Sequence, residues 1–264
     1  AKEESVNTIL EMAEYKKAGS CKVLIVTGCM AQRYKNEIIE EVPEVDAVLG
    51  TTSYGDILKA INEAMEGKHF EEFKDIDYLP EKLGKRVLTT GGHFGYLKIA
   101  EGCDKHCTYC IIPKLRGKFR SVPMERLIEQ AKEMAEEGVK ELILVAQETT
   151  VYGTDIYGKK SLHVLLKELC KIKGIRWIRV LYCYPEEIYD ELIQTMKEEK
   201  KICHYLDLPI QHASDRILKR MGRRTTQAEL VAIVNKLRQE IPDIVLRTTL
   251  ISGFPGETQE DHEE

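Results

Sequence analysis

The sequence predicts an α/β protein in which a small α/β domain precedes a larger series of alternating strands and helices. Short apolar runs rich in β-branched residues alternate with segments of helical periodicity over most of the 264 residues. Residues 67–92 lack clear periodicity and contain Pro80 and several glycines, which is typical of a connection between domains. We therefore expect domains at residues 1–72 and 93–264, with a linker at 73–92.

The first domain should contain two short parallel strands packed between helices. We expect the strands at residues 21–27 and 47–49, and the helices at 4–17, 30–41 and 54–66. Two strands bury little apolar surface, and no strand precedes the first helix. We therefore expect the first strands of this domain to lie upstream of Ala1, in a longer protein.

The second domain repeats a strand followed by a helix. The strands are expected at residues 94–100, 140–146, 177–182, 204–208 and 244–251, and the helices at 124–137, 161–172, 186–198 and 227–240. Residues 256–258 then carry helix-start signals, but the sequence stops at Glu264, within the first turns of that helix. We therefore expect the core to be truncated after its fifth strand. Repeated β-crossover units form either a barrel or an open doubly wound sheet, and both place their chemistry at the carboxyl ends of the strands.

Composition excludes several classes of protein. The formal net charge of −5 argues against a globally basic nucleic-acid-binding protein. We find no apolar run of eighteen residues and no secretory signal, so we expect no membrane helix and no disulfide framework among the eight cysteines. Four cysteines in apolar surroundings are expected to be small buried side chains: Cys21, Cys170, Cys183 and Cys203.

Two basic clusters follow predicted strand ends. They consist of Lys114, Arg116, Lys118 and Arg120, and of Lys219, Arg220, Arg223 and Arg224. Solvated loop charge accounts for either cluster alone, although the position after a strand also suits contacts to an anionic group. The sequence leaves this choice open.

The strongest functional signal is the cysteine triad Cys103, Cys107 and Cys110, which directly follows the first strand of the second domain. Three thiolates can bind three irons of a cubane cluster and leave the fourth iron open, because no fourth cysteine follows nearby. A zinc site would need a fourth protein ligand, for which His106 is the candidate. The spacing favours the iron–sulfur cluster.

The C-x3-C-x2-C spacing resembles the motif of the radical S-adenosylmethionine (SAM) superfamily. The resemblance implies a partial TIM-type (β/α) barrel whose open iron binds SAM, and it identifies no catalytic residue beyond the cluster. Tyr109 holds the aromatic position that contacts the adenosyl group in that family. Residues at other strand ends complete the expected SAM contacts: Gln147, Thr149, Gln211, Arg247 and Gly253. Taken singly, each of them also suits a simple role in a turn or a cap.

Within that superfamily the chain is most similar to the methylthiotransferases. Cys29, in a Gly-Cys-Met-Ala-Gln stretch, resembles the third ligand of an auxiliary [4Fe-4S] cluster in their flavodoxin-like N-terminal domain. The other two ligands would lie upstream. Taken alone, a cysteine after a strand is more often a buried or capping residue.

The family has two substrate branches, and the stretches 145–155 and 221–226 resemble the branch that modifies a β-carbon of aspartate in a small-subunit ribosomal protein. The alternative substrate is a tRNA adenosine. The resemblance implies cytoplasmic location, two clusters in the full-length protein, and an electron donor such as flavodoxin or ferredoxin. Because the family's C-terminal substrate-binding domain is missing, we expect this chain by itself to be inactive. A non-catalytic zinc protein is the other alternative.

Overall fold

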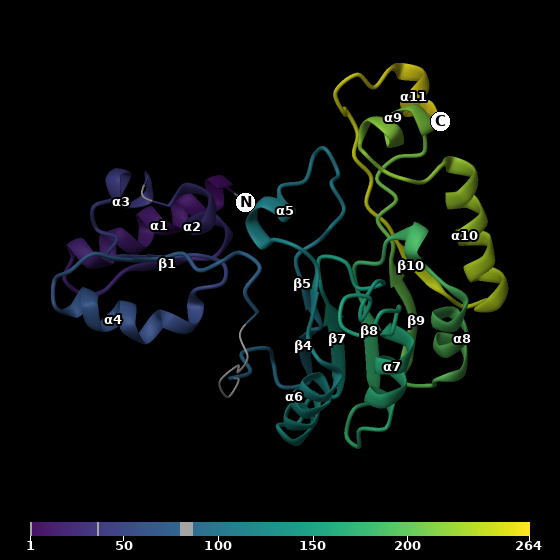
Figure 1. The fold of residues 1–264 in the computed structure, drawn as a ribbon, viewed down its shortest axis with the longest axis horizontal. Coiled ribbons are helices and arrows are strands. Elements are labelled where there is room, and N and C mark those ends of the chain that lie inside the picture. Colours follow the sequence, from purple (N-terminus) through teal and green to yellow (C-terminus); the bar gives the residue numbers. More distant parts are fainter. Residues whose placement is uncertain (1, 36, 80–86) are drawn as a thin grey trace. The chain divides into compact units, whose positions relative to one another are not determined.

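The computed structural model describes residues 2–35, 37–79 and 87–264, and these form two compact units (Figure 1). Unit one comprises the described part of residues 1–84 together with 111–117, and unit two comprises the described part of 85–110 together with 118–264. Segment 111–117 therefore packs with unit one although it directly follows the cysteine motif in the chain.

Unit one is built on a parallel three-stranded sheet in the order β1-β2-β3. Its strands are β1 (Ile25–Thr27), β2 (Ala47–Leu49) and β3 (Phe70–Glu72). The prediction of two strands was wrong, because β3 is short and polar and carries little apolar signal. The expected strand at 21–27 is also shorter, since only its last three residues pair with β2.

The helices of unit one cover both faces of this sheet. Figure 1 shows α1, α2 and α3 along one face and α4 along the other. The expected helix at 30–41 is divided, because Lys35 adopts a φ of 42° and ends α2. The expected helix at 54–66 begins as a 3-10 turn, η1 (Tyr54–Asp56). The helices are α1 (Lys2–Lys17), α2 (Cys29–Tyr34), α3 (Glu37–Glu41), α4 (Ile57–Met65) and α5 (Ile112–Arg116).

Unit two is built on a parallel five-stranded sheet in the order β10-β9-β8-β7-β4. Each strand lies beside the one that precedes it in this series, as in part of a (β/α) barrel. The predicted α/β class with a partial barrel is confirmed. The strands are β4 (Phe94–Lys98), β7 (Glu141–Val145), β8 (Trp177–Val180), β9 (Ile202–Asp207) and β10 (Val245–Arg247).

The first expected strand of this unit, at 94–100, ends at Lys98 instead. The chain then forms β5 (Ala100–Glu101), which pairs antiparallel with β6 (Arg120–Ser121). This small ribbon closes the segment that contains the cysteine motif, since one strand precedes the motif and the other follows it.

Unit two has six described α-helices and one described 3-10 turn, η2 (Pro185–Glu187), which lies at the start of the helix expected at 186–198. The short helix α9 (Asp215–Arg220) was not expected, because six residues carry no clear periodic signal. The remaining helices lie close to their predicted positions: α6 (Met124–Glu136), α7 (Leu162–Cys170), α8 (Asp190–Glu198), α10 (Gln227–Glu240) and α11 (Gln259–Glu263).

One apolar core holds unit two together. Leu142 and Leu144 of β7 are fully buried, and they pack in a cluster with side chains of α6, α7 and α8. Cys170 and Cys183 belong to this core as expected, whereas Cys21 and Cys203 are only half-buried. The core fixes the sheet and so fixes where its strands end.

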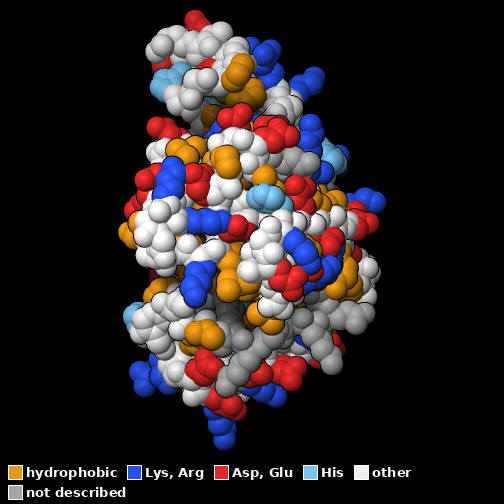
Figure 2. Space-filling model, turned by 90° about the vertical axis from the view of Figure 1, so that its left-hand side faces the viewer, with side chains coloured by type: hydrophobic (Ala, Val, Ile, Leu, Met, Phe, Trp, Pro, Cys, Tyr) orange, Lys and Arg blue, Asp and Glu red, His pale blue; other side chains and the backbone are white. Residues whose placement is uncertain are grey.

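The described surface carries mixed charge. Figure 2 shows basic and acidic side chains interspersed over the face that it views, in agreement with the small net charge. Among the described helices, none is long and apolar enough to cross a membrane.

Replacing Leu144 by Ala should destabilise unit two by ~2–5 kcal/mol, because it removes a fully buried side chain and leaves a cavity. Denaturant unfolding followed by the fluorescence of Trp177 in β8, the single tryptophan, measures this. Val231→Ala on α10, where the side chain is 54% exposed, is the control and should change stability by less than about 0.5 kcal/mol. Equal stability of the two variants would contradict the assignment of this core.

Candidate metal centre

The cysteine motif occupies a loop at the carboxyl end of the sheet in unit two. Residues 102–110 follow β5 directly, and Gly102 adopts a φ of 78°, which favours glycine and turns the chain out of the ribbon. The backbone amide of Gly102 donates to Oε1 of Gln147 at 2.8 Å, just beyond β7. The side chain of Gln147 therefore joins the start of the loop to the end of the neighbouring strand.

Further contacts hold the loop from its other sides. The amide of Thr108 donates to the carbonyl of Met221 at 2.9 Å, and its hydroxyl donates to the carbonyl of Arg220 at 3.0 Å. Gly222, at φ 74°, permits this approach, because a Cβ there would lie 3.2 Å from the carbonyl oxygen of His106. The ammonium of Lys105 pairs with Glu187 of η2. The loop is thus held by the segments that follow β7 and β8, by the last residue of α9 and by the residue after it.

Cys103 and Cys107 are buried, and Cys110 is half-buried. Burial raises the pKa of the Cys103 thiol to about 11. Among the described residues, no three His, Cys, Asp or Glu side chains are grouped tightly enough to hold a single metal ion. A cubane cluster does not require such grouping, since each of its thiolates binds a different iron.

A hydrogen-bonded tyrosine adjoins the motif. The hydroxyl of Tyr184 lies 3.1 Å from Sγ of Cys107, and the guanidinium of Arg223 lies over the Tyr184 ring, 4.2 Å from its centroid. Arg223 is 6% exposed, and its Nη2 donates to Oε2 of Glu186 at 3.0 Å. Its Nε and Nη1 are buried without a hydrogen-bond partner among the described residues.

A second buried charged group faces the same space. Glu148 is 1% exposed, and its Oε1 accepts a hydrogen bond from the amide of Thr150 at 2.8 Å. Its Oε2 is buried and has no partner among the described residues. Burial raises the pKa of this carboxyl to about 7.

Cys103, Cys107, Glu148 and Arg223 line one pocket of about 390 Å³. This volume lies within the range of small-molecule sites, roughly 300–1,000 Å³. Unpaired donors and acceptors on buried side chains are costly unless a ligand satisfies them. The pocket thus offers two thiols, an acceptor and two donors to a polar ligand, and these residues fit a cluster with SAM beside it. Its other lining residues include Asp104, Lys105, His106, Phe119, Tyr184, Glu186 and Arg224.

Three of the predicted SAM contacts lie beside the cysteine loop or at nearby strand ends. Tyr109 packs edge-to-face on Phe254 with ring centroids 6.4 Å apart, and burial together with Cys107 raises its pKa. The side-chain oxygen of Gln147 accepts the hydrogen bond from the amide of Gly102. The Thr149 hydroxyl is buried and donates to the carbonyls of Leu181 and Tyr182. Thr149 therefore joins the ends of β7 and β8.

The other three predicted contacts lie at the ends of β9 and β10. Gln211, with a φ of 72°, forms a bridge to Leu250. Arg247 pairs with Asp207 at 2.7 Å. Gly253 adopts a φ of 75°. None of the six predicted SAM contacts is among the described residues that line the pocket, and their role in binding SAM stays a prediction.

Cys29 begins α2 in unit one. Its Sγ accepts a hydrogen bond from Nε of Arg116 in α5 at 3.2 Å, within the same unit. This contact accounts for one member of the first basic cluster. Cys29 therefore lies at the first position of α2, with the guanidinium of Arg116 against its sulfur.

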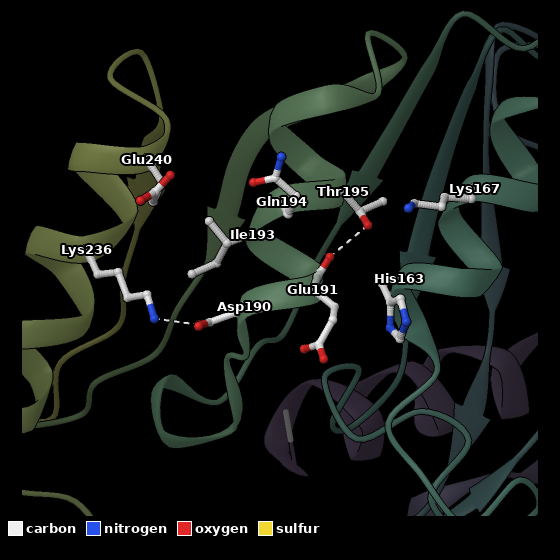
Figure 3. Close-up of a pocket in the computed structure, with 9 residues that line it drawn as sticks. All are labelled: His163, Lys167, Asp190, Glu191, Ile193, Gln194, Thr195, Lys236 and Glu240. Atoms are coloured by element: carbon white, nitrogen blue, oxygen red, sulfur yellow. Dashed lines mark hydrogen bonds and ion pairs between the residues drawn. The ribbon is translucent and has the colours of Figure 1, made fainter.

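A different pocket, of about 580 Å³, lies among α7, α8 and α10 (Figure 3). Its charges are partly paired with one another: Lys236 of α10 points toward Asp190 of α8, at 2.5 Å. Thr195 donates to a backbone carbonyl of its own helix. None of the motif cysteines lines it, so it is not the candidate site.

Sequence reasoning missed three residues of the site. Glu148 stands between Gln147 and Thr149, which were both selected, and Arg223 belongs to a basic cluster whose role was left open. Tyr184 follows β8 in a Tyr-Cys-Tyr-Pro stretch and carries no motif. Only the packing of strand ends shows that these three side chains share a pocket with the cysteines.

Two family models match the chain. The radical SAM superfamily matches residues 97–264, and the uncharacterized protein family UPF0004 matches residues 1–50. The cysteine motif lies wholly within the radical SAM match.

The chain is similar along its whole length to curated proteins named ribosomal protein uS12 methylthiotransferase RimO. The relative from Lachnoclostridium phytofermentans is 70% identical over 263 residues, and one from Clostridium perfringens is 57% identical over 266. Both alignments cover 100% of this chain. The chain spans about 60% of the length of these relatives.

Solved structures share the fold at low identity. The cobalamin-dependent SAM radical enzyme OxsB superimposes with a TM-score of 0.66 at 16% identity, over 95% of this chain and 39% of OxsB. The radical SAM methyltransferase TsrM from Kitasatospora setae gives 0.52 at 17% identity, over 64% of this chain and 32% of TsrM. These likenesses establish the fold alone.

The raised pKa of Glu148 predicts a pH-dependent stability. An ordinary Glu titrates near 4.5, so the folded, cluster-free chain binds more protons than the unfolded chain between pH 4.5 and 7. Its stability therefore falls as pH rises through this window. Glu148→Gln should be more stable than the parent at pH 8, by up to about 3 kcal/mol, and equally stable below pH 4.5. Denaturant unfolding of parent and variant across pH measures this. Stability curves of the two proteins that run parallel would disprove the raised pKa of this carboxyl.

Proposed function

The chain belongs to the radical SAM superfamily, and we propose that it forms part of a methylthiotransferase acting on an aspartate of a small-subunit ribosomal protein. The observation that carries the proposal is the pocket beside Cys103 and Cys107, where the buried Glu148 and Arg223 keep unpaired polar atoms. A protein that served only as a scaffold, with no ligand in this pocket, would leave these buried atoms without a hydrogen-bond partner. A charged ligand with both amino and carboxylate groups can satisfy both of them.

Cys103, Cys107 and Cys110 would hold a [4Fe-4S] cluster, with SAM on its open iron. When bound, these cofactors would supply the radical chemistry that activates a C–H bond of the substrate. The chain's own residues position and shield the site. Gln147 fixes the start of the loop, and Lys105 pairs with Glu187 at its side.

The two buried charges give the pocket its polarity. Glu148 offers an acceptor from the end of β7, and Arg223 offers donors from the segment after α9. Because both are almost fully buried, a ligand that meets them is also removed from water. Water exclusion protects a radical from side reactions.

Unit one would contribute to a second, auxiliary cluster. Cys29 supplies one ligand, and Arg116 lies against its sulfur at 3.2 Å. Residues 1–50, which include Cys29, match a different family model from the one that matches the cysteine triad.

The substrate assignment is supported by the identity of 70% to a relative named for ribosomal protein uS12. The activity proposed is that of the whole protein, of which this chain covers a part. An electron donor such as flavodoxin or ferredoxin would reduce the cluster, and a substrate on the ribosome implies a cytoplasmic location. A tRNA adenosine is the substrate that the test must distinguish.

Anaerobic reconstitution of this chain should yield bound iron and sulfide with broad visible absorption. Each of the single replacements Cys103→Ala, Cys107→Ala and Cys110→Ala should abolish the cluster, because three thiolates are needed to hold it. Cys203→Ala, a half-buried cysteine of β9 outside the motif, should retain it. One tightly bound zinc in place of iron would contradict the proposal.

The substrate is tested with the full-length protein, reduced and supplied with SAM and a sulfur source. Mass analysis of the ribosomal protein should show a methylthio group on one aspartate, and Cys107→Ala should reduce this product by more than 100-fold, roughly. Nucleoside analysis of tRNA from the same reaction should show no methylthio adenosine. The reverse pattern would replace the ribosomal protein by tRNA as the substrate.

A further inference from the structure

Tyr184 and Cys107 form a buried contact between a hydroxyl and a sulfur. The two atoms lie 3.1 Å apart, within hydrogen-bonding distance for sulfur, and Cys107 is 5% exposed while Tyr184 is 8% exposed. In the thiol form either atom can donate. Once Cys107 is a thiolate on iron it has no proton to give, so the tyrosine hydroxyl must be the donor.

Arg223 strengthens this donor through the ring. Its guanidinium lies 4.2 Å from the Tyr184 ring centroid, and its side chain is fully buried. A cation held over a phenol ring draws electron density away from the hydroxyl, and burial limits the screening of this effect by water. Glu186 balances the charge of Arg223 at 3.0 Å, on the guanidinium's Nη2. The pair therefore polarises the ring without adding net charge to the pocket.

We propose that the Tyr184 hydroxyl, polarised by Arg223, donates a hydrogen bond to the Cys107 thiolate and raises the reduction potential of the [4Fe-4S] cluster. The inference rests on the proposed cluster at Cys103, Cys107 and Cys110. Reduction adds negative charge to a cluster and its thiolates, and a hydrogen bond to a ligand sulfur stabilises the more negative state. Tyr184 is thus a positioning residue, since it acts on the cluster through Cys107.

The test is an anaerobic redox titration of the reconstituted chain, with the reduced cluster followed by electron paramagnetic resonance. Tyr184→Phe removes only the hydroxyl and should shift the potential to a more negative value. At a fixed solution potential, the ratio of reduced to oxidised cluster should fall by roughly tenfold, the equivalent of one hydrogen bond to a charged group. Tyr189→Phe is the matched control, because that hydroxyl contacts His163 and no cysteine.

The double variant Arg223→Met with Glu186→Gln tests the role of the cation without changing net charge. It should lower the potential in the parent chain and have no further effect in the Tyr184→Phe background. A parent-like potential in Tyr184→Phe with full iron content would overturn the proposal. Loss of the cluster from Tyr184→Phe but not from Tyr189→Phe would also overturn it, because the hydroxyl would then serve assembly of the site.

These outcomes are separate from those of the proposed function. The titration requires a bound cluster and no ribosomal protein, so absence of methylthio transfer leaves its result unaffected. Failure of the parent chain to bind iron and sulfide would refute the proposed cluster itself. An unchanged potential in a fully loaded variant refutes only the role of Tyr184.

Discussion

Two buried charged side chains with unpaired polar atoms define the pocket beside the cysteine motif. Glu148 and Arg223 are each less than a tenth exposed, and each keeps at least one hydrogen-bonding atom without a partner among the described residues. Leaving one such atom unsatisfied costs about 1–3 kcal/mol, and more for a charged group. A folded chain tolerates this cost where a ligand offsets it. The rest of the site can be understood as the scaffold that keeps these groups and the cysteines together.

The parallel sheet is what brings them together. β4, β7 and β8 end at one edge, so residues that are far apart in sequence meet there, as Gly102 and Gln147 do at 2.8 Å. The core beneath, with Leu142 and Leu144 fully buried, holds the register of these strands. The loop after β5 is then fixed at both ends, by Gln147 near its start and by the carbonyl of Met221 near its end. The packing of the sheet therefore determines the geometry of the site.

Much of the fold followed from periodicity, and the failures have physical causes. Helix α10 matches its predicted range because its apolar residues recur at helical spacing, and strand β2 matches because it is a continuous apolar run that is fully buried. β3 and α9 were missed because a three-residue polar strand and a six-residue helix leave no periodic signal. The division between α2 and α3 depends on the backbone at Lys35, which apolar spacing does not reveal. In the site, spacing identified the three cysteines, since adjacent ligands are local in sequence. Tyr184 and Arg223 were beyond this approach because their relation to Cys107 exists only in the folded chain.

The proposed metal centre depends on three thiolates that hold a cluster with one iron open to SAM. Mössbauer spectroscopy of the chain reconstituted with ⁵⁷Fe tests it most directly, because the method distinguishes the iron sites within one cluster. We predict that adding SAM alters the signal of a single iron site and leaves the other three unchanged. A spectrum that SAM does not alter, or one in which all four sites respond alike, would refute an open iron in this cluster.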